Sequence, residues 1–204
     1  MRAFVAIALP EATRAVLTSA AATFQACAPD WAREKWVPDE NLHVTLQFIG
    51  DLPDEAVPAT LDALHLACSP FSAFTLSVRD IVARPSGKRA RMLWARFADG
   101  VEPARRLAAG LSTALADAIG LDPEPRPFTP HVTLVRFRVP RRPPDDALLA
   151  ANAVLDRAAA SCGASAPSPL FVSVTCATLM SSQLSRTGPT YEEVASVPLG
   201  GRSG

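Results

Sequence analysis

Apolar and polar residues alternate in the segment LHVTLQF, residues 42–48. The apolar positions are Leu42, Val44, Leu46 and Phe48, and the polar ones are His43, Thr45 and Gln47. Side chains of a strand point alternately to its two sides, so this period of two predicts a strand with one apolar face and one polar face.

The centre of this segment occurs a second time. The tetrapeptide His-Val-Thr-Leu of residues 43–46 returns at 131–134, inside FTPHVTLVRF (128–137). The chain has 3 histidines, and the remaining one, His65 in DALHLAC, has no such context. A single strand histidine is more often structural than catalytic, but two in the same apolar-backed HxT context favour a functional role.

The other patterns predict alternating strands and helices. Short β-branched or aromatic runs predict strands, and apolar residues at helical spacing predict helices. The predicted strands are 2–9, 74–84, 91–97, 169–182 and 188–199, with a brief extended piece at 35–38 and a turn at 85–89. The predicted helices are 10–28, 53–68, 101–120 and 143–161.

Each half of the chain thus runs through a strand, a helix and an HVTL strand. We expect an α+β, bilobal, pseudo-twofold fold in which two antiparallel-rich sheets face a central cleft and helices lie outside. A parallel α/β sheet is the weaker alternative, because no glycine-rich loop joins a strand to a helix. We expect one bilobal domain over 1–199 and a flexible tail over 200–204.

Charge is informative only locally, since the formal net charge is +0. Cationic residues cluster at 79–91 and again at 136–142. A solvated surface and a groove that attracts phosphate are equally compatible with such clusters.

Cysteine spacing and hydropathy favour a cytoplasmic protein. The 4 cysteines are widely spaced, with neither zinc-finger spacing nor a disulfide framework. No apolar stretch approaches the roughly 18 residues that span a bilayer. The apolar run at 2–9 is followed at once by Pro10 and Glu11, which favours a strand over a signal peptide.

Residues i and i+2 of a strand share a face, so His43 projects beside Thr45 and His131 beside Thr133. If the two polar faces meet across one cleft, one imidazole can act as a base while the other acts as an acid. The threonine hydroxyls can donate hydrogen bonds to anionic oxygens between them. Zinc binding is a weak alternative because further ligands are missing, and no GxSxG or P-loop pattern is present.

The paired HxTx tetrapeptides resemble those of the two-histidine (2H) phosphoesterase superfamily. The flanking segments MRAFVAIALPE, KWVPDENLHVTLQFIGDLP, RMLWARF, LDPEPRPFTPHVTLVRF and SQLSRTGPTYEEVASVPL are similar to its bacterial and archaeal RNA 2′,3′-cyclic phosphodiesterase branch, once described as 2′-5′ RNA ligase. The resemblance implies the bilobal 2H phosphoesterase fold. It also implies metal-independent hydrolysis of an RNA terminal 2′,3′-cyclic phosphate to a 2′-phosphate, with reverse 2′-5′ ligation as a possible side activity.

By that resemblance, His43 is the proton donor to the departing oxygen and His131 is the proton acceptor that activates water. Thr45 and Thr133 hold the phosphate oxygens, and no cofactor or metal is implied. The expected partner is RNA with a cyclic phosphate end or a cyclic nucleotide, with no membrane, no obligate protein partner and a monomeric state.

Further contacts are predicted from residue type alone. Candidate RNA contacts are Arg136, Arg89 and Arg91 for phosphates, and Trp36, Phe48 and Phe128 for stacking on a base. Two other functions fit the same residues: an RNA- or nucleotide-binding module with vestigial catalysis, and a phosphoesterase acting on small cyclic phosphates.

Overall fold

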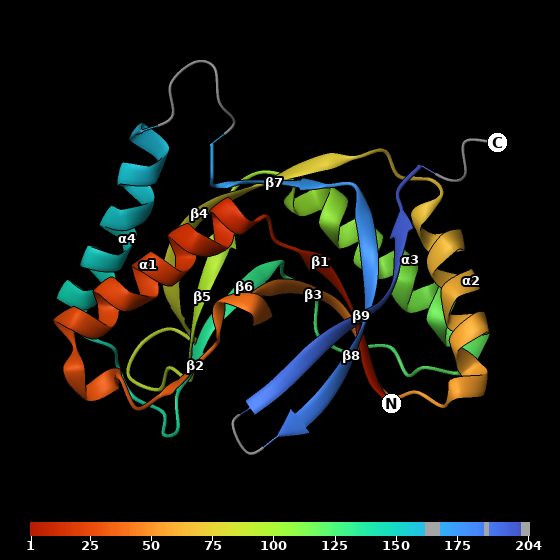
Figure 1. The fold of residues 1–204 in the computed structure, drawn as a ribbon, viewed down its shortest axis with the longest axis horizontal. Coiled ribbons are helices and arrows are strands. Elements are labelled where there is room, and N and C mark those ends of the chain that lie inside the picture. The colour runs from red at the N-terminus through yellow and green to blue at the C-terminus, as the bar shows by residue number, and fades with distance from the viewer. Residues whose placement is uncertain (162–167, 186–187, 201–204) are drawn as a thin grey trace.

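A computed structural model describes residues 1–161, 168–185 and 188–200 of the chain (Figure 1). The helices are α1 (Glu11–Cys27), α2 (Val57–Cys68), α3 (Val101–Ile119) and α4 (Asp145–Ala160). The strands are β1 (Arg2–Ala8), β2 (Lys35–Trp36), β3 (His43–Asp51), β4 (Phe74–Arg84), β5 (Met92–Phe97), β6 (His131–Arg136), β7 (Phe171–Val174), β8 (Cys176–Ser185) and β9 (Gly188–Pro198).

The strands form a four-stranded sheet in the order β3-β1-β8-β9 and a five-stranded sheet in the order β2-β6-β5-β4-β7. Every strand pairing is antiparallel, which confirms the predicted α+β class. The two HVTL strands have equivalent places. β3 pairs with β1 across the connection that holds α1, and β6 pairs with β5 across the connection that holds α3.

Each sheet contains strands from both the N-terminal and the C-terminal half of the chain. β4 follows α2 in the chain but joins the sheet of β6, and β8 joins the sheet of β3. The predicted single strand 169–182 is therefore wrong: β7 pairs with β4, whereas β8, after Thr175, pairs with β1. A continuous apolar pattern cannot reveal this division, because both pieces are extended and partly buried.

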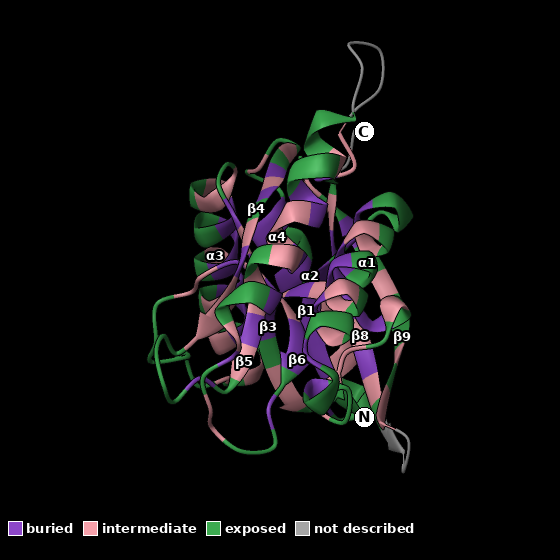
Figure 2. Cartoon of the chain, turned by 90° about the vertical axis from the view of Figure 1, so that its left-hand side faces the viewer, coloured by how far each residue is buried: buried purple, intermediate pink, exposed green. Residues whose placement is uncertain are grey.

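Helices flank the sheets as two packed pairs, α1 with α4 and α2 with α3 (Figure 1). In α3, Leu107, Leu111 and Leu115 recur every four residues and are all fully buried. Fully burying one such side chain contributes about 1.5–3 kcal/mol. Buried residues accordingly gather in the strands and on the inward sides of the helices, while the outward sides are exposed (Figure 2).

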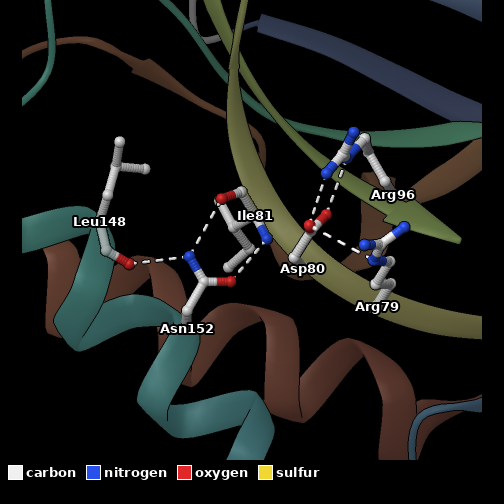
Figure 3. A network of polar contacts seen from close by, with 6 residues as sticks. All are labelled: Arg79, Asp80, Ile81, Arg96, Leu148 and Asn152. Atoms are coloured by element: carbon white, nitrogen blue, oxygen red, sulfur yellow. Dashed lines mark hydrogen bonds and ion pairs between the residues drawn. The ribbon is translucent and has the colours of Figure 1, made fainter. Parts of the chain in front are cut away.

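A polar network fixes the β4–β5 part of the second sheet (Figure 3). β7 pairs only with Phe74–Ser77, so the β4 backbone needs another partner further on. Asn152 of α4 supplies it: its Oδ1 accepts from Ile81 N at 2.8 Å and its Nδ2 donates to Ile81 O at 3.0 Å. Next to Ile81, Asp80 accepts from Arg96 Nε at 2.8 Å, and Arg96 lies directly opposite His131 in the sheet.

Both HVTL strands contain a β-bulge that the alternation did not predict. Along β3, Ala6 faces Thr45 but Val5 faces Gln47, so the register shifts by one residue at Leu46. Gln47 consequently turns inward (8% exposed) and Phe48 turns outward (63% exposed), the reverse of the predicted faces. A bulge reverses the alternation because it places two residues opposite one.

The predicted tail falls largely outside the described residues: Gly200 is described and donates its N–H to Cys68 O at 3.3 Å, and 201–204 are not. Among the helices that the structure describes, none combines the length and the apolar character that a membrane crossing requires.

Candidate active site

The two HVTL strands lie next to each other where the two sheets meet, and their polar faces line one cavity of about 390 Å³. His43 and Thr45 enter it from β3, and His131 and Thr133 enter it from β6. The other lining residues are Arg2, Ala3, Phe4, Val37, Asn41, Phe48, Gly50, Arg136, Ser182, Pro189 and Tyr191. The predicted meeting of both HxT pairs in a shared cavity is therefore what the structure shows.

Backbone hydrogen bonds fix the orientation of His43. Its Nδ1 lies 2.7 Å from the carbonyl oxygen of Asn41, and because a carbonyl only accepts, Nδ1 carries the proton. Its Nε2 lies 2.9 Å from Thr45 Oγ1, so in the neutral ring the hydroxyl donates to Nε2. The Asn41 side chain donates in turn to Pro189 O at 2.8 Å, which ties this loop to the start of β9.

His131 repeats this arrangement in the other sheet. Its Nδ1 donates to the carbonyl oxygen of Thr129 at 2.8 Å, again two residues before the histidine. The Trp94 ring stacks on the imidazole, with centroids 3.6 Å apart and planes at 18°. The guanidinium of Arg84 lies over Trp94, 5.4 Å from its centroid. Nδ1 is protonated here too, so Nε2 is the basic nitrogen of the neutral ring.

The surroundings lower the pKa of both histidines. For His43, burial is the main cause; the hydrogen bond to Asn41 opposes it and the charge of Arg136 adds to it. For His131, burial again comes first, opposed by the hydrogen bond to Thr129, and the charges of Arg136, His43 and Arg84 lower the pKa further. Both rings are therefore favoured as neutral before an anion binds, and protonating one disfavours protonating the other.

The cavity is suited to an anion. Among the described residues that line it, none is acidic, whereas Arg136 and Arg2 are cationic. Tyr191 also lines it, and burial raises the pKa of its phenol, which keeps the hydroxyl protonated as a donor. Unpaired positive charge at a cavity concentrates negatively charged ligands.

The auxiliary predictions divide into two groups. Phe48 and Arg136 line the cavity, because the bulges of β3 and β6 return the fifth residue after each histidine to the polar face. Arg89 and Arg91 are exposed near the β4–β5 turn and do not line it.

The aromatic candidates Trp36 and Phe128 do not line the cavity either. Trp36 packs against Phe24, with centroids 5.7 Å apart, and donates to Trp31 O at 2.9 Å, so its ring belongs to the packing around α1. Phe128 is half-buried against the hydrophobic core. Neither ring is therefore placed to stack on a base held between the histidines.

Most of the second arginine cluster is structural. Arg141 Nη2 pairs with Glu34 Oε1 at 2.7 Å, and its guanidinium stacks over Trp31 at 3.6 Å. Arg138 N donates to the other oxygen of Glu34 at 2.6 Å, and Arg142 pairs with Asp145 at 2.6 Å. Of this cluster, Arg136 alone lines the cavity.

Sequence reasoning missed Trp94, Tyr191, Phe4 and Asn41. Alternation in 91–97 offered one signal, since Trp94 lies opposite Thr133 on the cavity face of the sheet. Tyr191 and Phe4 both contact His43, with ring centroids 5.3 Å and 4.9 Å away, but their strands are far from His43 in the sequence. Asn41 positions His43 through its backbone carbonyl, which no residue type reveals.

No cluster of three or more histidine, cysteine or acidic residues with metal-binding geometry occurs within the described part of the chain. The donors that face the cavity include imidazoles, hydroxyls and guanidinium groups, a set suited to proton transfer and to holding an anion.

Comparison with known proteins agrees with this site. Residues 7–94 match the family model described as LigT like Phosphoesterase. The RNA 2′,3′-cyclic phosphodiesterase of Thermus thermophilus is 32% identical over 151 residues, which cover 71% of this chain and 73% of the relative. The chain belongs to the LigT-like phosphoesterase family.

A second relative of this LigT-like phosphoesterase has the same name as the Thermus thermophilus protein, and solved structures share its fold. The RNA 2′,3′-cyclic phosphodiesterase of Aeropyrum pernix is 36% identical over 110 residues, and the match spans only 61% of that relative. The crystal structure of TT0787 of Thermus thermophilus superposes with a TM-score of 0.73 at 26% identity, covering 98% of this chain and 99% of that one. E. coli LigT complexed with 3′-AMP superposes with a TM-score of 0.68 at 25% identity, covering 97% of each chain.

Proposed function

We propose that this LigT-like phosphoesterase hydrolyses the 2′,3′-cyclic phosphate at an RNA end to a 2′-phosphomonoester. The observation that carries the proposal is the convergence of two imidazoles, two threonine hydroxyls and Arg136 on one cavity whose described lining residues include no carboxylate. A relative with this activity in its name, 32% identical over 151 residues, supports the same reaction.

In the proposed reaction, Nε2 of His131 accepts a proton from water, and the water oxygen attacks phosphorus. The bond between phosphorus and the 3′-oxygen breaks as His43 gives its Nε2 proton to that oxygen, leaving the phosphate on the 2′-oxygen. The net change is the addition of one water, with a proton moved from His43 to the product and another from water to His131. Exchange with solvent then restores both histidines.

The neighbours of each histidine support this division. Arg84 disfavours the charged form of His131, as a base requires, whereas Arg84 is not among the causes that lower the pKa of His43. Negative charge on a bound substrate raises the pKa of a nearby imidazole, so the substrate itself helps to protonate His43. Arg136, Thr45 and Thr133 then stabilise the charge that develops on the non-bridging oxygens.

Phe48 is the proposed platform for the terminal base. Phe48 is 63% exposed and lines the cavity that also holds the two histidines. Stacking of a base on an aromatic ring contributes about 1–3 kcal/mol. The structure of E. coli LigT with 3′-AMP, 25% identical and matched over 97% of each chain, supports a nucleotide site in this fold.

We further propose that the reaction needs no metal, because the cyclic ester already holds its leaving oxygen beside an acid. The same two groups can run a ligation, in which a 5′-hydroxyl takes the place of water, attacks the cyclic phosphate and displaces the 3′-oxygen to form a 2′-5′ linkage. Turnover that persists in EDTA supports the metal-free mechanism. Turnover that EDTA abolishes and a divalent cation restores contradicts it.

Phosphorus NMR of a 2′,3′-cyclic nucleotide incubated with the protein tests the function directly. We expect conversion to the 2′-monophosphate, lost in His43→Ala and His131→Ala. Binding without conversion indicates the nucleotide-binding module instead. The same assay is run on an RNA that ends in a 2′,3′-cyclic phosphate. Turnover of the cyclic mononucleotide but not of this RNA indicates a phosphoesterase for small cyclic phosphates.

A further inference from the structure

Three cations form a row across the five-stranded sheet. Lys35 of β2 lies directly opposite Arg136 of β6, Arg136 lies opposite Met92 of β5, and Met92 lies opposite Arg84 of β4. Residues directly opposite one another in antiparallel strands project to the same face. Since Arg136 lines the cavity, this cationic row (Lys35, Arg136 and Arg84) lies on the cavity side of the sheet.

The charges of the cationic row are not neutralised by the protein. Within residues 1–161, 168–185 and 188–200, no carboxylate forms an ion pair with any of the three. Arg136 Nη1 donates to Met92 Sδ at 3.2 Å, a weak acceptor, and Arg84 lies over Trp94. The arrangement is costly for the sheet, because like charges directly opposite each other are destabilising. Violations of such local rules are expected at functional sites.

We infer that the cationic row binds the phosphates that precede the reacting end of a single-stranded RNA, an inference that rests on the proposed function. Arg136 reaches the reacting phosphate inside the cavity, while Lys35 and Arg84 flank it. The row spans three strand spacings of about 4.8 Å, or about 14 Å in all, enough for more than one phosphate group. Contacts to phosphates carry no base information, so the row favours RNA over mononucleotides without choosing a sequence.

In its described residues, the four-stranded sheet has no equivalent row of cations. At the position on β3 that matches Arg136, Phe48 lies opposite Phe4 of β1, so two aromatic rings replace the charges. RNA would therefore place its terminal base on the four-stranded sheet and its preceding backbone on the five-stranded one.

The test compares 2′,3′-cyclic AMP with a tetranucleotide that ends in a 2′,3′-cyclic phosphate. Lys35→Gln is the informative variant, because Arg84 also contacts Trp94. We expect it to lower kcat/KM for the tetranucleotide about fivefold more than for cyclic AMP, and to reduce the salt slope of tetranucleotide turnover by about 0.7. The matched control is Arg106→Gln, which removes an exposed arginine that lies over Phe71 of the α2–β4 connection. This control should leave kcat/KM unchanged for both substrates.

Equal losses on both substrates, or none on the tetranucleotide, would overturn the inference. A binding measurement distinguishes failure of this inference from failure of the proposed function. If neither substrate is turned over, the function is wrong, and fluorescence anisotropy with a labelled tetranucleotide ending in a 2′-phosphate still tests the row. There, Lys35→Gln should weaken binding about fivefold at low salt and Arg106→Gln should not; unchanged binding overturns the inference.

Discussion

The two HVTL strands share a tetrapeptide, a bulge and a carbonyl acceptor for Nδ1, yet their surroundings differ. The fifth residue after the histidine is Phe48 on β3 and Arg136 on β6, and both line the cavity. His43 is packed against Phe4 and Tyr191, whereas His131 is stacked on Trp94 with Arg84 beyond it.

This difference gives a near-symmetric pair of motifs the unequal surroundings that the proposed asymmetric reaction requires. The tetrapeptide supplies an imidazole with a fixed tautomer and a hydroxyl beside it. The residues that follow the tetrapeptides and the neighbouring strands then add the exposed Phe48 ring to one side, and the Arg136 cation and the Trp94 ring with Arg84 beyond it to the other. In the proposed reaction, the acid and base roles thus follow from residues outside the repeat.

Removing either imidazole should have the largest effect. General acid–base catalysis contributes about 10²–10⁴ in rate, so His43→Ala and His131→Ala should each lower kcat by that order. His65→Ala, which removes the exposed helix histidine, is the control and should not. A variant of either cavity histidine with near wild-type kcat would exclude that residue from proton transfer.

Phe48 and Arg136 should affect different kinetic constants. Arg136→Met removes positive charge from the transition state and should lower kcat about 100-fold. Phe48→Ala removes a stacking surface and should raise KM about tenfold while leaving kcat nearly unchanged. The measurement is steady-state kinetics on cyclic AMP, and identical kcat and KM effects in the two variants would contradict the division.

Loss of the Trp94 stack should affect only the His131 side. We expect Trp94→Leu to lower kcat about tenfold with little change in KM, because a base that is free to rotate is less often in line with water. Trp94→Phe should restore most of the rate. In NMR spectra, the His131 ring-proton shift should move in Trp94→Leu while that of His43 does not; an unchanged His131 shift would show that the rings do not stack in solution.

The smallest effect concerns Arg84. Its charge lowers the pKa of His131, so Arg84→Met should raise that pKa, and activity should then be lost at a higher pH on acidification. The upward shift should be small, because Arg84 lies beyond the Trp94 ring that stacks on His131. NMR titration of the histidines measures it, with Arg106→Met as the control. A His131 pKa that does not rise relative to this control contradicts the assigned role of Arg84.

Period and spacing were sufficient to predict most elements. The helix expected at 101–120 is Val101–Ile119, and the helix expected at 53–68 is Val57–Cys68, preceded by a short 3-10 turn. Period two also identified the strands that bear the histidines, because one face of each is buried and the other faces the cavity.

The sequence-based predictions are wrong where strand pairing, and not the local residue pattern, determines the structure. The bulges invert Gln47 and Phe48, and pairing with different sheets divides 169–182 into β7 and β8. Strand pairing also decides which residues surround the histidines, since it brings Trp94 against His131 and Tyr191 to the cavity. Likewise, the partners of Arg138 and Arg141 come from the distant Glu34.

The most direct measurement of unequal roles uses a cyclic substrate whose 3′-bridging oxygen is replaced by sulfur. A thiolate leaves without being protonated, since the pKa of a thiol is near 8.5 and far below that of an alcohol. We predict that this substrate reduces the deficit of His43→Ala from the order of 10³ to less than about tenfold, and leaves the deficit of His131→Ala intact. Equal deficits, or recovery of His131→Ala instead, would contradict the assignment of acid and base.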